Sequence, residues 1–497
     1  MTISHNTTAP PRLLSTGVEG LDYVLRGGLA EDRLYLIEGM PGSGKTTLAL
    51  QFLMEGVRQA EPVLYITLSE TLAELNAVAA SHGWDLKGIH IHEVIASEDF
   101  LDPAQQHTLF HPSEVELGDT TQNISSIVET VKPKRVIIDS LSELRLLSSS
   151  PHRYRRQVLA YKQFFARRNC TVIMLDDRPD THDMQIRSIA HGVIGLDQTD
   201  NEYGNGRRRL RVLKYRGANF REGYHDYAIR YGGVVVFPRL VAAETRRVKE
   251  LTQISCGIAA LDTQLGGGIE AGTSTIIGGP PGTGKSTLAA QFAISATQRG
   301  DKAAMFIFEE STNTLLNRTA SLGLFLDEAV RSGDITIQQI DPAEMSPGEF
   351  THQVSQAVEQ NNVKLIVIDS LNGYLNAMPD ERFLTLHMHE LLSYLGQHGV
   401  TTIVVGVHQG MIGSAMSTAV EASYLADNVI LLRHFESDGE VHQAISVFKK
   451  RASAHERTIR EFSISEKGVL VGSVLQQFHG VLTGIPTFTG SKLDALE

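Results

Sequence analysis

The sequence has little of what marks secreted, membrane-spanning or nucleic-acid-binding proteins. Its only cysteines are Cys170 and Cys256, too few for a disulfide framework and in keeping with a reducing cytosol. No stretch approaches the roughly 18 consecutive apolar residues of a membrane span, and the polar residues 1–11 lack the apolar segment of a signal peptide. Acidic residues outnumber basic ones by 57 to 45, and this net charge of −12 does not favour a nucleic-acid surface. We therefore expect a cytoplasmic protein without membrane or nucleic-acid partners.

A long pattern occurs twice along the chain. With 497 residues the chain is too long for one ordinary core. The pattern S-x-G-x-x-x-L-D appears at Ser15–Asp22 and again at Ser255–Asp262, 240 positions later. A repeat of this length indicates duplication of a whole domain rather than a solenoid of short units. We expect two domains, residues 1–245 and residues 246–497.

Each half also carries the pattern G-x-x-x-x-G-K-[ST] of a phosphate-binding loop, between an apolar strand and a helix-forming run. The glycines let backbone N–H groups turn toward phosphate oxygens, and the start of the helix adds a partial positive charge. The lysine then reaches the β- and γ-phosphates, and the hydroxyl after it holds Mg²⁺. The nucleotide-binding residues predicted in this way are Gly39, Gly42, Ser43, Gly44, Lys45, Thr46 and Thr47 in the first half, and Gly279, Gly282, Thr283, Gly284, Lys285, Ser286 and Thr287 in the second.

Short apolar strands alternate with helical runs in both halves. This alternation predicts an α/β fold, in which each half forms a mainly parallel sheet with helices on both faces. Strands are expected at 34–38, 63–68, 135–138, 171–175, 210–214 and 227–229, and at 274–278, 303–308, 364–368, 401–405, 444–448 and 459–464. Helical runs include 153–168 and 381–396, and the turns at 232–233 and 466–468 suit hairpins at the sheet edge.

One apolar strand in each half ends in an aspartate, at Asp139 and at Asp369. An acid at this place is the usual companion of a phosphate-binding loop, where it binds Mg²⁺ or a water coordinated to it. On its own such an aspartate more often caps a turn. Its recurrence downstream of both loops favours the metal-binding interpretation for Asp139 and Asp369.

The strand after the first helix also ends in acids, and here the halves differ. The second half reads Glu309-Glu310, and the first reads Ser69-Glu70. A carboxylate near the γ-phosphate can orient or deprotonate a water or hydroxyl. Ser69 cannot act as such a base at neutral pH, so Glu70 is left alone in the first half. Solvated acids at a strand end remain the alternative.

A basic K-x-R pattern follows a late strand in each half, at Lys214 with Arg216 and at Lys449 with Arg451. Charged side chains at a strand end are usually just solvated. In a ring of such domains, however, a Lys/Arg pair at this place can reach the γ-phosphate bound by a neighbour. The residues alone do not decide between these two roles.

In order and spacing these motifs resemble the KaiC proteins, two-domain ATPases of the RecA superfamily, over nearly the whole chain. The resemblance implies two RecA-like domains in a double-ring homohexamer with Mg²⁺ and ATP at subunit interfaces. It implies slow ATP hydrolysis in the first domain, and autokinase and autophosphatase activity in the second. It assigns catalysis to Glu309, Glu310 and Glu70, metal binding to Thr46, Asp139, Ser286 and Asp369, and contacts to a neighbour's ATP to Lys214, Arg216, Lys449 and Arg451. Ser69 departs from the Glu-Glu pair usual in the first domain.

The resemblance also points to a phosphoacceptor. Ser423 falls on the acceptor serine and Tyr424 on the adjacent threonine, and Thr418 is a further hydroxyl nearby. Because Tyr424 replaces the threonine, we do not expect a faithful two-site Ser/Thr cycle, and an ordinary surface Ser-Tyr pair remains the alternative. Clock members carry a longer C-terminal tail, which the activator KaiA binds. Because the tail of this chain is shorter, a KaiA-type activator is not expected. A KaiB-like or other signalling protein stays open as a partner.

Three functions are consistent with these patterns. The first is an ATPase and serine autokinase that acts as a timing or signalling switch. The second is a RecA/DnaB-like motor on DNA, which would need a basic stripe. The only dense basic surface expected is the helix from Tyr154 to Arg168. The third is a nucleotide-dependent scaffold, which the departure at Ser69 would allow in the first ring.

Overall fold

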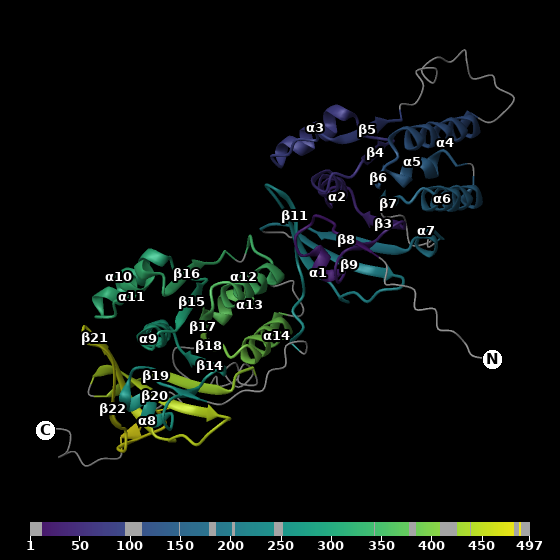
Figure 1. Ribbon diagram of the computed structural model, residues 1–497. Helices are drawn as coiled ribbons and strands as arrows, with labels where there is room; N and C mark the ends of the chain where they lie inside the picture. The colour runs from purple at the N-terminus through teal and green to yellow at the C-terminus, as the bar shows by residue number, and fades with distance from the viewer. Residues whose placement is uncertain are drawn as a thin grey trace, which may run out of the picture. The chain divides into compact units, whose positions relative to one another are not determined.

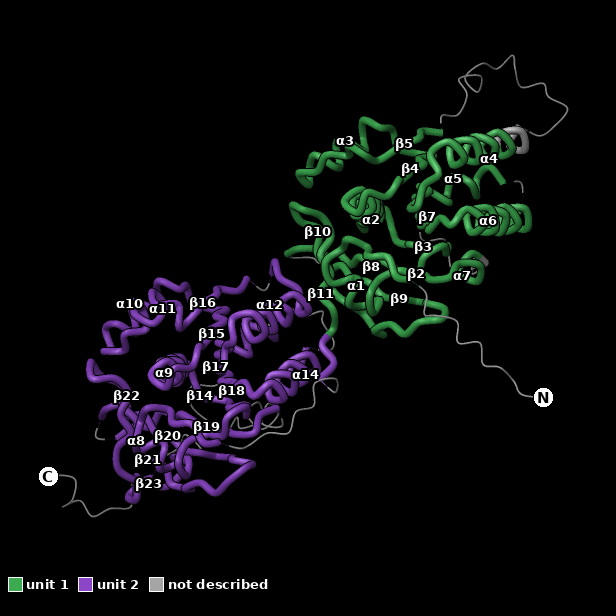
Figure 2. Tube along the Cα trace, in the orientation of Figure 1, with its two compact units in different colours: residues 1–239 green, residues 240–497 purple. Residues whose placement is uncertain are grey.

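The computed structural model describes residues 12–94, 112–148, 150–177, 185–200, 204–242, 252–341, 343–376, 384–407, 425–437, 439–481 and 487–488. The chain divides into two compact units, residues 1–239 and 240–497 (Figure 2). The boundary expected after residue 245 falls outside the described residues. No helix in the described ranges is long and apolar enough to cross a membrane.

Unit 1 is built on a nine-stranded mixed sheet in the order β11-β10-β9-β8-β3-β7-β6-β4-β5 (Figure 1). The neighbours from β8 to β5 are parallel, and β9, β10 and β11 add on in antiparallel fashion. The strands are β3 (Leu34–Gly39), β4 (Val63–Thr67), β5 (Ile89–Glu93), β6 (Arg135–Asp139), β7 (Thr171–Asp177), β8 (Gly192–Thr199), β9 (Arg207–Tyr215), β10 (His225–Arg230) and β11 (Gly233–Phe237), with β1 (Leu13–Leu14) paired to β2 (Leu29–Ala30). The helices are α1 (Leu21–Val24), α2 (Lys45–Arg58), α3 (Leu72–Ser81), α4 (Pro112–Val131), α5 (Leu141–Leu146), α6 (Pro151–Ala166) and α7 (Gln185–Ile189).

Unit 2 repeats this architecture, with the sheet order β16-β15-β17-β18-β14-β19-β20-β21-β22. Its strands are β14 (Ser274–Gly279), β15 (Lys302–Ile307), β16 (Ile335–Gln339), β17 (Val363–Asp369), β18 (Thr401–Val407), β19 (Asn428–Ser437), β20 (Glu440–Lys450), β21 (Ile459–Ser465) and β22 (Gly468–Val474), with the short pairs β12 (Gln253–Ile254) with β13 (Ile269–Glu270) and β23 (Phe478–His479) with β24 (Thr487–Phe488). Its helices are α8 (Ala259–Gln264), α9 (Lys285–Gln298), α10 (Thr312–Ser321), α11 (Leu326–Ser332), α12 (Pro347–Glu359), α13 (Leu371–Asn376) and α14 (Leu384–Gln397). The predicted α/β class, with two mainly parallel sheets, is confirmed.

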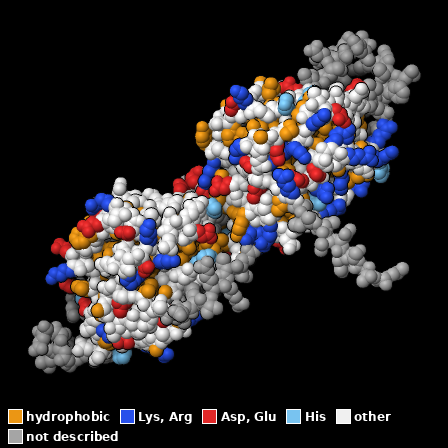
Figure 3. Space-filling model, viewed as in Figure 1, with side chains coloured by type: hydrophobic (Ala, Val, Ile, Leu, Met, Phe, Trp, Pro, Cys, Tyr) orange, Lys and Arg blue, Asp and Glu red, His pale blue; other side chains and the backbone are white. Residues whose placement is uncertain are grey.

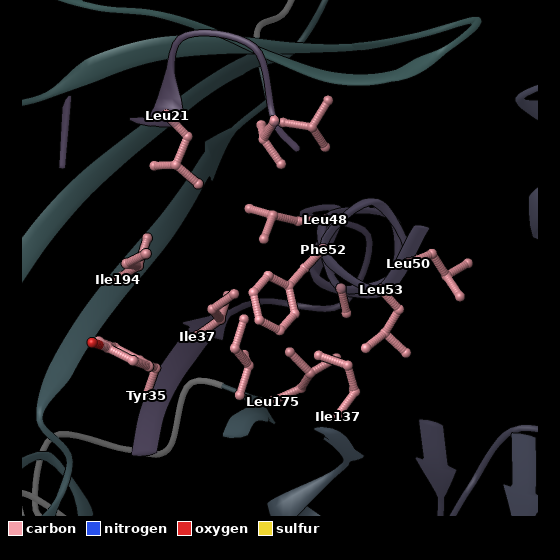
Figure 4. Close-up of a cluster of buried hydrophobic side chains, with 14 of the residues drawn as sticks. Leu21, Tyr35, Ile37, Leu48, Leu50, Phe52, Leu53, Ile137, Leu175 and Ile194 are labelled. Carbon is pink, nitrogen blue, oxygen red and sulfur yellow. The ribbon is translucent and has the colours of Figure 1, made fainter. Parts of the chain in front are cut away.

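Helices cover both faces of each sheet, which explains why the central strands β3 and β14 are buried at every position. In β3, Tyr35 and Ile37 pack into the cluster that contains Phe52 of α2 (Figure 4). The alternate residues Leu34 and Leu36 belong to a second cluster on the opposite face, formed with α4, α5 and α6. Burial of each large side chain contributes about 1.5–3 kcal/mol. The strand that carries the phosphate-binding loop is therefore held from two sides.

The S-x-G-x-x-x-L-D pattern has a structural role. Its aspartate accepts hydrogen bonds from the residues at the start of the pattern, and we call this set of bonds the staple. Asp22 in α1 accepts hydrogen bonds from Ser15 Oγ (2.7 Å), from the backbone N–H of Thr16 (2.8 Å) and from Thr16 Oγ1 (2.7 Å). In unit 2, Asp262 accepts equivalent bonds from Ser255 Oγ and from the N–H of Cys256. The pattern thus ties the entry segment of each unit to its first helix.

Candidate functional site

The phosphate-binding loops connect the central strand of each sheet to the helix that follows it. The loop glycines have positive φ, 81° at Gly42 and 89° at Gly44, where only glycine is unstrained. Gly282 and Gly284 repeat this geometry with 79° and 89°. The loops lie at the carboxyl ends of the parallel strands, the edge at which open α/β sheets bind ligands.

The antiparallel hairpins of the sheets support these loops from one side. A Cβ atom on Gly44 would lie 2.6 Å from Ile229 Cδ1 of β10, and one on Gly284 would lie 2.2 Å from Ile464 Cδ1 of β21. Tyr227 of β10 donates its hydroxyl hydrogen to the backbone oxygen of Ser43 at 2.7 Å. Hairpin and loop are therefore in direct contact, and close packing is a second reason for the glycines.

Both loop lysines fold back over their loops. Lys45 Nζ donates to the backbone oxygens of Gly39 (2.8 Å) and Met40 (3.1 Å), and Lys285 Nζ donates to that of Pro280 (2.7 Å). Both side chains are buried. A cation in this position is available to phosphate oxygens that enter the loop.

Lys45 has an additional acidic partner, for which Lys285 has no equivalent among the described residues. Its ammonium lies 3.0 Å from Asp177 Oδ1 at the end of β7. Ser142 Oγ donates to the other oxygen of that carboxylate at 2.9 Å. In unit 2 the same register position next to the loop strand is occupied by Val407. No sequence pattern pointed to Asp177, because strand order alone brings β7 beside β3.

The two predicted metal-binding acids lie next to the loop hydroxyls. Asp139 Oδ2 accepts hydrogen bonds from Thr46 Oγ1 (3.3 Å) and from Tyr65 Oη (2.5 Å), and burial raises the pKa of Asp139. Burial, together with the charges of Glu310 and Glu309, raises the pKa of Asp369 to about 6, against a hydrogen bond from Ser286. One hydroxyl and one carboxylate fit Mg²⁺, which takes its other ligands from water and nucleotide phosphates. Within the described ranges no group of three or more His, Cys, Asp or Glu side chains could hold a metal without such help.

In unit 1 a single glutamate follows the end of β4. Burial, and after it the charges of Asp139 and Glu74, raises the pKa of Glu70 to about 7, although Lys45 opposes this. Its buried Oε2 atom has no hydrogen-bond partner within the described residues. A carboxylate that titrates near neutral pH is suited to accept a proton. Ser69 is exposed and adds no second carboxylate.

In unit 2 both carboxylates lie at a cavity of about 470 Å³. Glu309 accepts a hydrogen bond from Ser370 Oγ at 2.5 Å, and Glu310 forms an ion pair with Arg318 at 2.6 Å. The residues that line the cavity are Gly282, Gly284, Lys285, Ser286, Thr287, Glu309, Glu310, Arg318, Leu322, Asp369 and Ile464. The structure thus brings the second loop, its acid and its two glutamates together around one space. The sequence patterns did not point to Arg318, Leu322 or Ile464.

The four basic side chains predicted to contact a neighbour's nucleotide are bound, within their own chain, to backbone oxygens and to one acid. Lys214 Nζ donates to the carbonyls of Arg187 (2.6 Å), Ser188 (3.1 Å) and Ala190 (2.7 Å), and Arg216 Nη2 donates to Ser188 O (2.9 Å). In the second unit, Lys449 Nζ donates to Ala426 O (2.8 Å), and Arg451 lies 3.5 Å from Asp427. A role for these four side chains toward another subunit stays a prediction. Ser423, Tyr424 and Thr418 lie outside the described residues.

The basic surface on α6 is visible in Figure 3, where Lys and Arg side chains gather over that helix. Part of this charge is engaged within the unit. Arg168 forms an ion pair with Glu129, and Lys162 donates to the backbone oxygen of Ile189 at 2.7 Å. A cluster on one helix is not the continuous stripe that a nucleic-acid groove requires.

Each unit combines a RecA-like sheet with a phosphate-binding loop and a strand-end acid, which defines the class as a tandem P-loop ATPase. The model of the KaiC ATPase family matches residues 14–241 and 254–476, and the chain belongs to that family. It is 27% identical over 484 residues to the circadian clock oscillator protein KaiC of Acaryochloris marina, which covers 95% of this chain and 91% of that protein. It is 27% identical to KaiC of Synechococcus elongatus over 481 residues (95% and 92%), and to circadian clock protein KaiC3 of a Synechocystis strain over 492 residues (96% and 95%). The resemblance seen in the sequence is thereby confirmed.

Proposed function

We propose that this KaiC-family ATPase is a phosphorylation switch, in which the second unit transfers phosphate from ATP to a serine of the protein and later removes it. The observation that carries the proposal is the pair Glu309 and Glu310 beside the second phosphate-binding loop, at one cavity with Asp369. The corresponding place in the first unit offers only Glu70. We therefore assign protein phosphorylation to the second unit and slow ATP hydrolysis to the first.

In the second unit, Lys285 binds the β- and γ-phosphates, and Ser286 with Asp369 holds Mg²⁺, which neutralises phosphate charge when bound. Glu309 accepts the proton of the attacking serine hydroxyl. The hydroxyl oxygen bonds to the γ-phosphorus, the bond from that phosphorus to the bridging oxygen breaks, and ADP is the leaving group. Ser423 is the acceptor that the resemblance favours, with Tyr424 and Thr418 as further candidates.

In the first unit, Lys45 and Thr46 bind ATP and Mg²⁺ together with Asp139. Glu70 orients and deprotonates the attacking water, a role that its raised pKa suits. We further propose a homohexamer, in which Lys214, Arg216, Lys449 and Arg451 contact the nucleotide of a neighbouring subunit. The relatives are circadian clock oscillator proteins, and by analogy a KaiB-like signalling protein is the kind of partner we expect. The alternative of a DNA-acting motor gains no support from the acidic composition or from the comparisons.

Incubation of the full chain with γ-labelled ATP and Mg²⁺, followed by phosphosite mapping, tests this proposal. We expect label on Ser423 in the wild type, loss of that label in Ser423→Ala, and no incorporation in Glu309→Gln. Glu328→Gln, which neutralises an exposed carboxylate on α11, is the matched control and should incorporate label normally. A wild type that incorporates no label refutes the autokinase. ATP hydrolysis that single-stranded DNA stimulates would instead favour the motor.

A further inference from the structure

The two neighbouring glutamates of unit 2 are held by different partners. Glu309 is exposed to solvent and accepts a hydrogen bond from Ser370, the residue directly after the metal-binding Asp369. Glu310 is more buried, with 23% of its side chain exposed, and it is paired with Arg318. Two adjacent carboxylates repel each other, and a cation beside one of them offsets this repulsion.

Arg318 uses both ends of its guanidinium group. Nη2 donates to Glu310 Oε1 at 2.6 Å, and Nη1 donates to Thr287 Oγ1 at 2.6 Å. Thr287 lies in the first turn of α9, two residues after Lys285, and is buried. A planar fork of this kind fixes direction as well as charge. Arg318 therefore fastens Glu310 to the helix that begins at the phosphate-binding loop.

The first unit supplies a natural comparison, because it keeps the backbone and lacks the arginine. Arg318 and Val78 each lie seven residues after the residue that caps their helix, Ser311 and Thr71. Val78 packs against the hydrophobic cluster of unit 1. Glu70, the counterpart of Glu310, thus has no guanidinium group at this place. The arginine accompanies the unit that has two carboxylates.

We propose that Arg318 is a positioning residue that gives the two glutamates different roles, by fastening Glu310 to Thr287 so that Glu309 alone serves the reacting hydroxyl. This inference rests on the proposed phosphoryl transfer at the second site. Glu309, Glu310 and Asp369 place three acids around Lys285, and Arg318 is the second cation that lines the cavity. Without it, the carboxylate of Glu310 is released into the space that an anionic phosphate must enter.

The test uses the full chain with Arg318→Met, which keeps the length and removes the fork, and Arg318→Lys, which keeps only the charge. We expect label transfer to slow on the order of 10- to 100-fold in Arg318→Met, the scale for a misplaced catalytic group, and less in Arg318→Lys. Asn317→Met, at an exposed neighbour on α10, is the matched control. The decisive variant is Arg318→Met/Glu310→Gln. Because the released charge is then gone, it should transfer label faster than Arg318→Met alone.

A merely structural arginine gives a different pattern. A double variant as slow as the single one, or Arg318→Met equal to Asn317→Met, overturns the inference. If Arg318→Met does not fold, Arg318→Lys with and without Glu310→Gln decides by the same comparison. A wild type that transfers no phosphate refutes the proposed autokinase. The role of Arg318 is then tested by the same comparison of variants, with the readout changed to the part of the ATP hydrolysis rate that Glu309→Gln removes. The two failures are thus distinguished.

Discussion

Replacing Asp177 with asparagine should tighten nucleotide binding at the first site. In the structure the Lys45 ammonium is 3.0 Å from the Asp177 carboxylate, with 9% and 48% of the two side chains exposed. An entering phosphate needs the same ammonium group, so nucleotide binding must first break this pair. Asparagine has the same shape and keeps an oxygen for Ser142 Oγ, which donates to Asp177 at 2.9 Å.

The magnitude follows from the exposure of the pair. Burial raises the pKa of Asp177, but the hydrogen bond and charge of Lys45 hold it below its usual value overall, so the carboxylate is ionised at neutral pH. A fully exposed pair contributes about 0–1 kcal/mol, and a hydrogen bond to a charged group about 1.5–3 kcal/mol. With one partner buried and the other half-exposed, about 1–1.5 kcal/mol is a fair value. That corresponds to roughly 5- to 12-fold tighter binding.

The measurement is a titration of the full chain with a fluorescent ATP analogue. Lys285→Ala in the same chain silences the second loop, so that only the first site reports. Asp119→Asn, which removes an exposed carboxylate on α4, controls for the change in net charge. Unchanged or weaker binding by Asp177→Asn would show that the carboxylate does not compete with phosphate for Lys45.

Two further predictions concern stability. Because the pKa of Glu70 is raised from 4.5 to about 7, its protonated form stabilises the nucleotide-free fold fully below pH 4.5, and this contribution is lost as the pH rises through 7. Discounted for a half-exposed side chain, the loss is about 1 kcal/mol. Calorimetry should find Glu70→Gln more stable than wild type at about pH 8 and equal to it at about pH 4, and an equal difference at both would contradict this. Asp22→Ala removes three hydrogen bonds from the staple and should destabilise unit 1 by about 2 kcal/mol, whereas Asp262→Ala should destabilise unit 2. Hydrogen exchange, followed separately for the two units, measures both effects. A uniform loss of protection across both units in either variant would count against the staple.

The parts of the fold that the sequence predicted are those with a local signal. The strands β3, β4, β6 and β7, their counterparts in unit 2 and the glycine loops are readable because they are largely buried or demand positive φ, whereas β8, which flanks β3, was not predicted. The strands β5 and β16 were not predicted. Their sequences, IHIHE and ITIQQ, alternate apolar and polar residues at a half-exposed sheet edge, a weak pattern over five residues.

The parts of the site that the sequence did not predict depend on contacts between distant segments. Asp177 reaches Lys45 only because β7 is inserted beside β3 in the sheet order. Tyr65 reaches Asp139 because β4 and β6 are neighbours, and in unit 2 the same register position holds Met305. Such contacts have no fixed spacing along the chain. The loops, the strand-end aspartates and the glutamates were predicted because each follows a local pattern that recurs in both halves.

The contact between the phosphate-binding loop and the antiparallel hairpin has a mechanical consequence. Strand β10 is three strands away from β3 in the sheet, yet Ile229 touches Gly44 and Tyr227 bonds to Ser43. The sheet must curl to close this contact, so a shift of the loop cannot leave the hairpin at rest. The loop and strand β10 are thus in contact through Ile229 and Tyr227, so we expect a displacement of the loop to be felt at this hairpin.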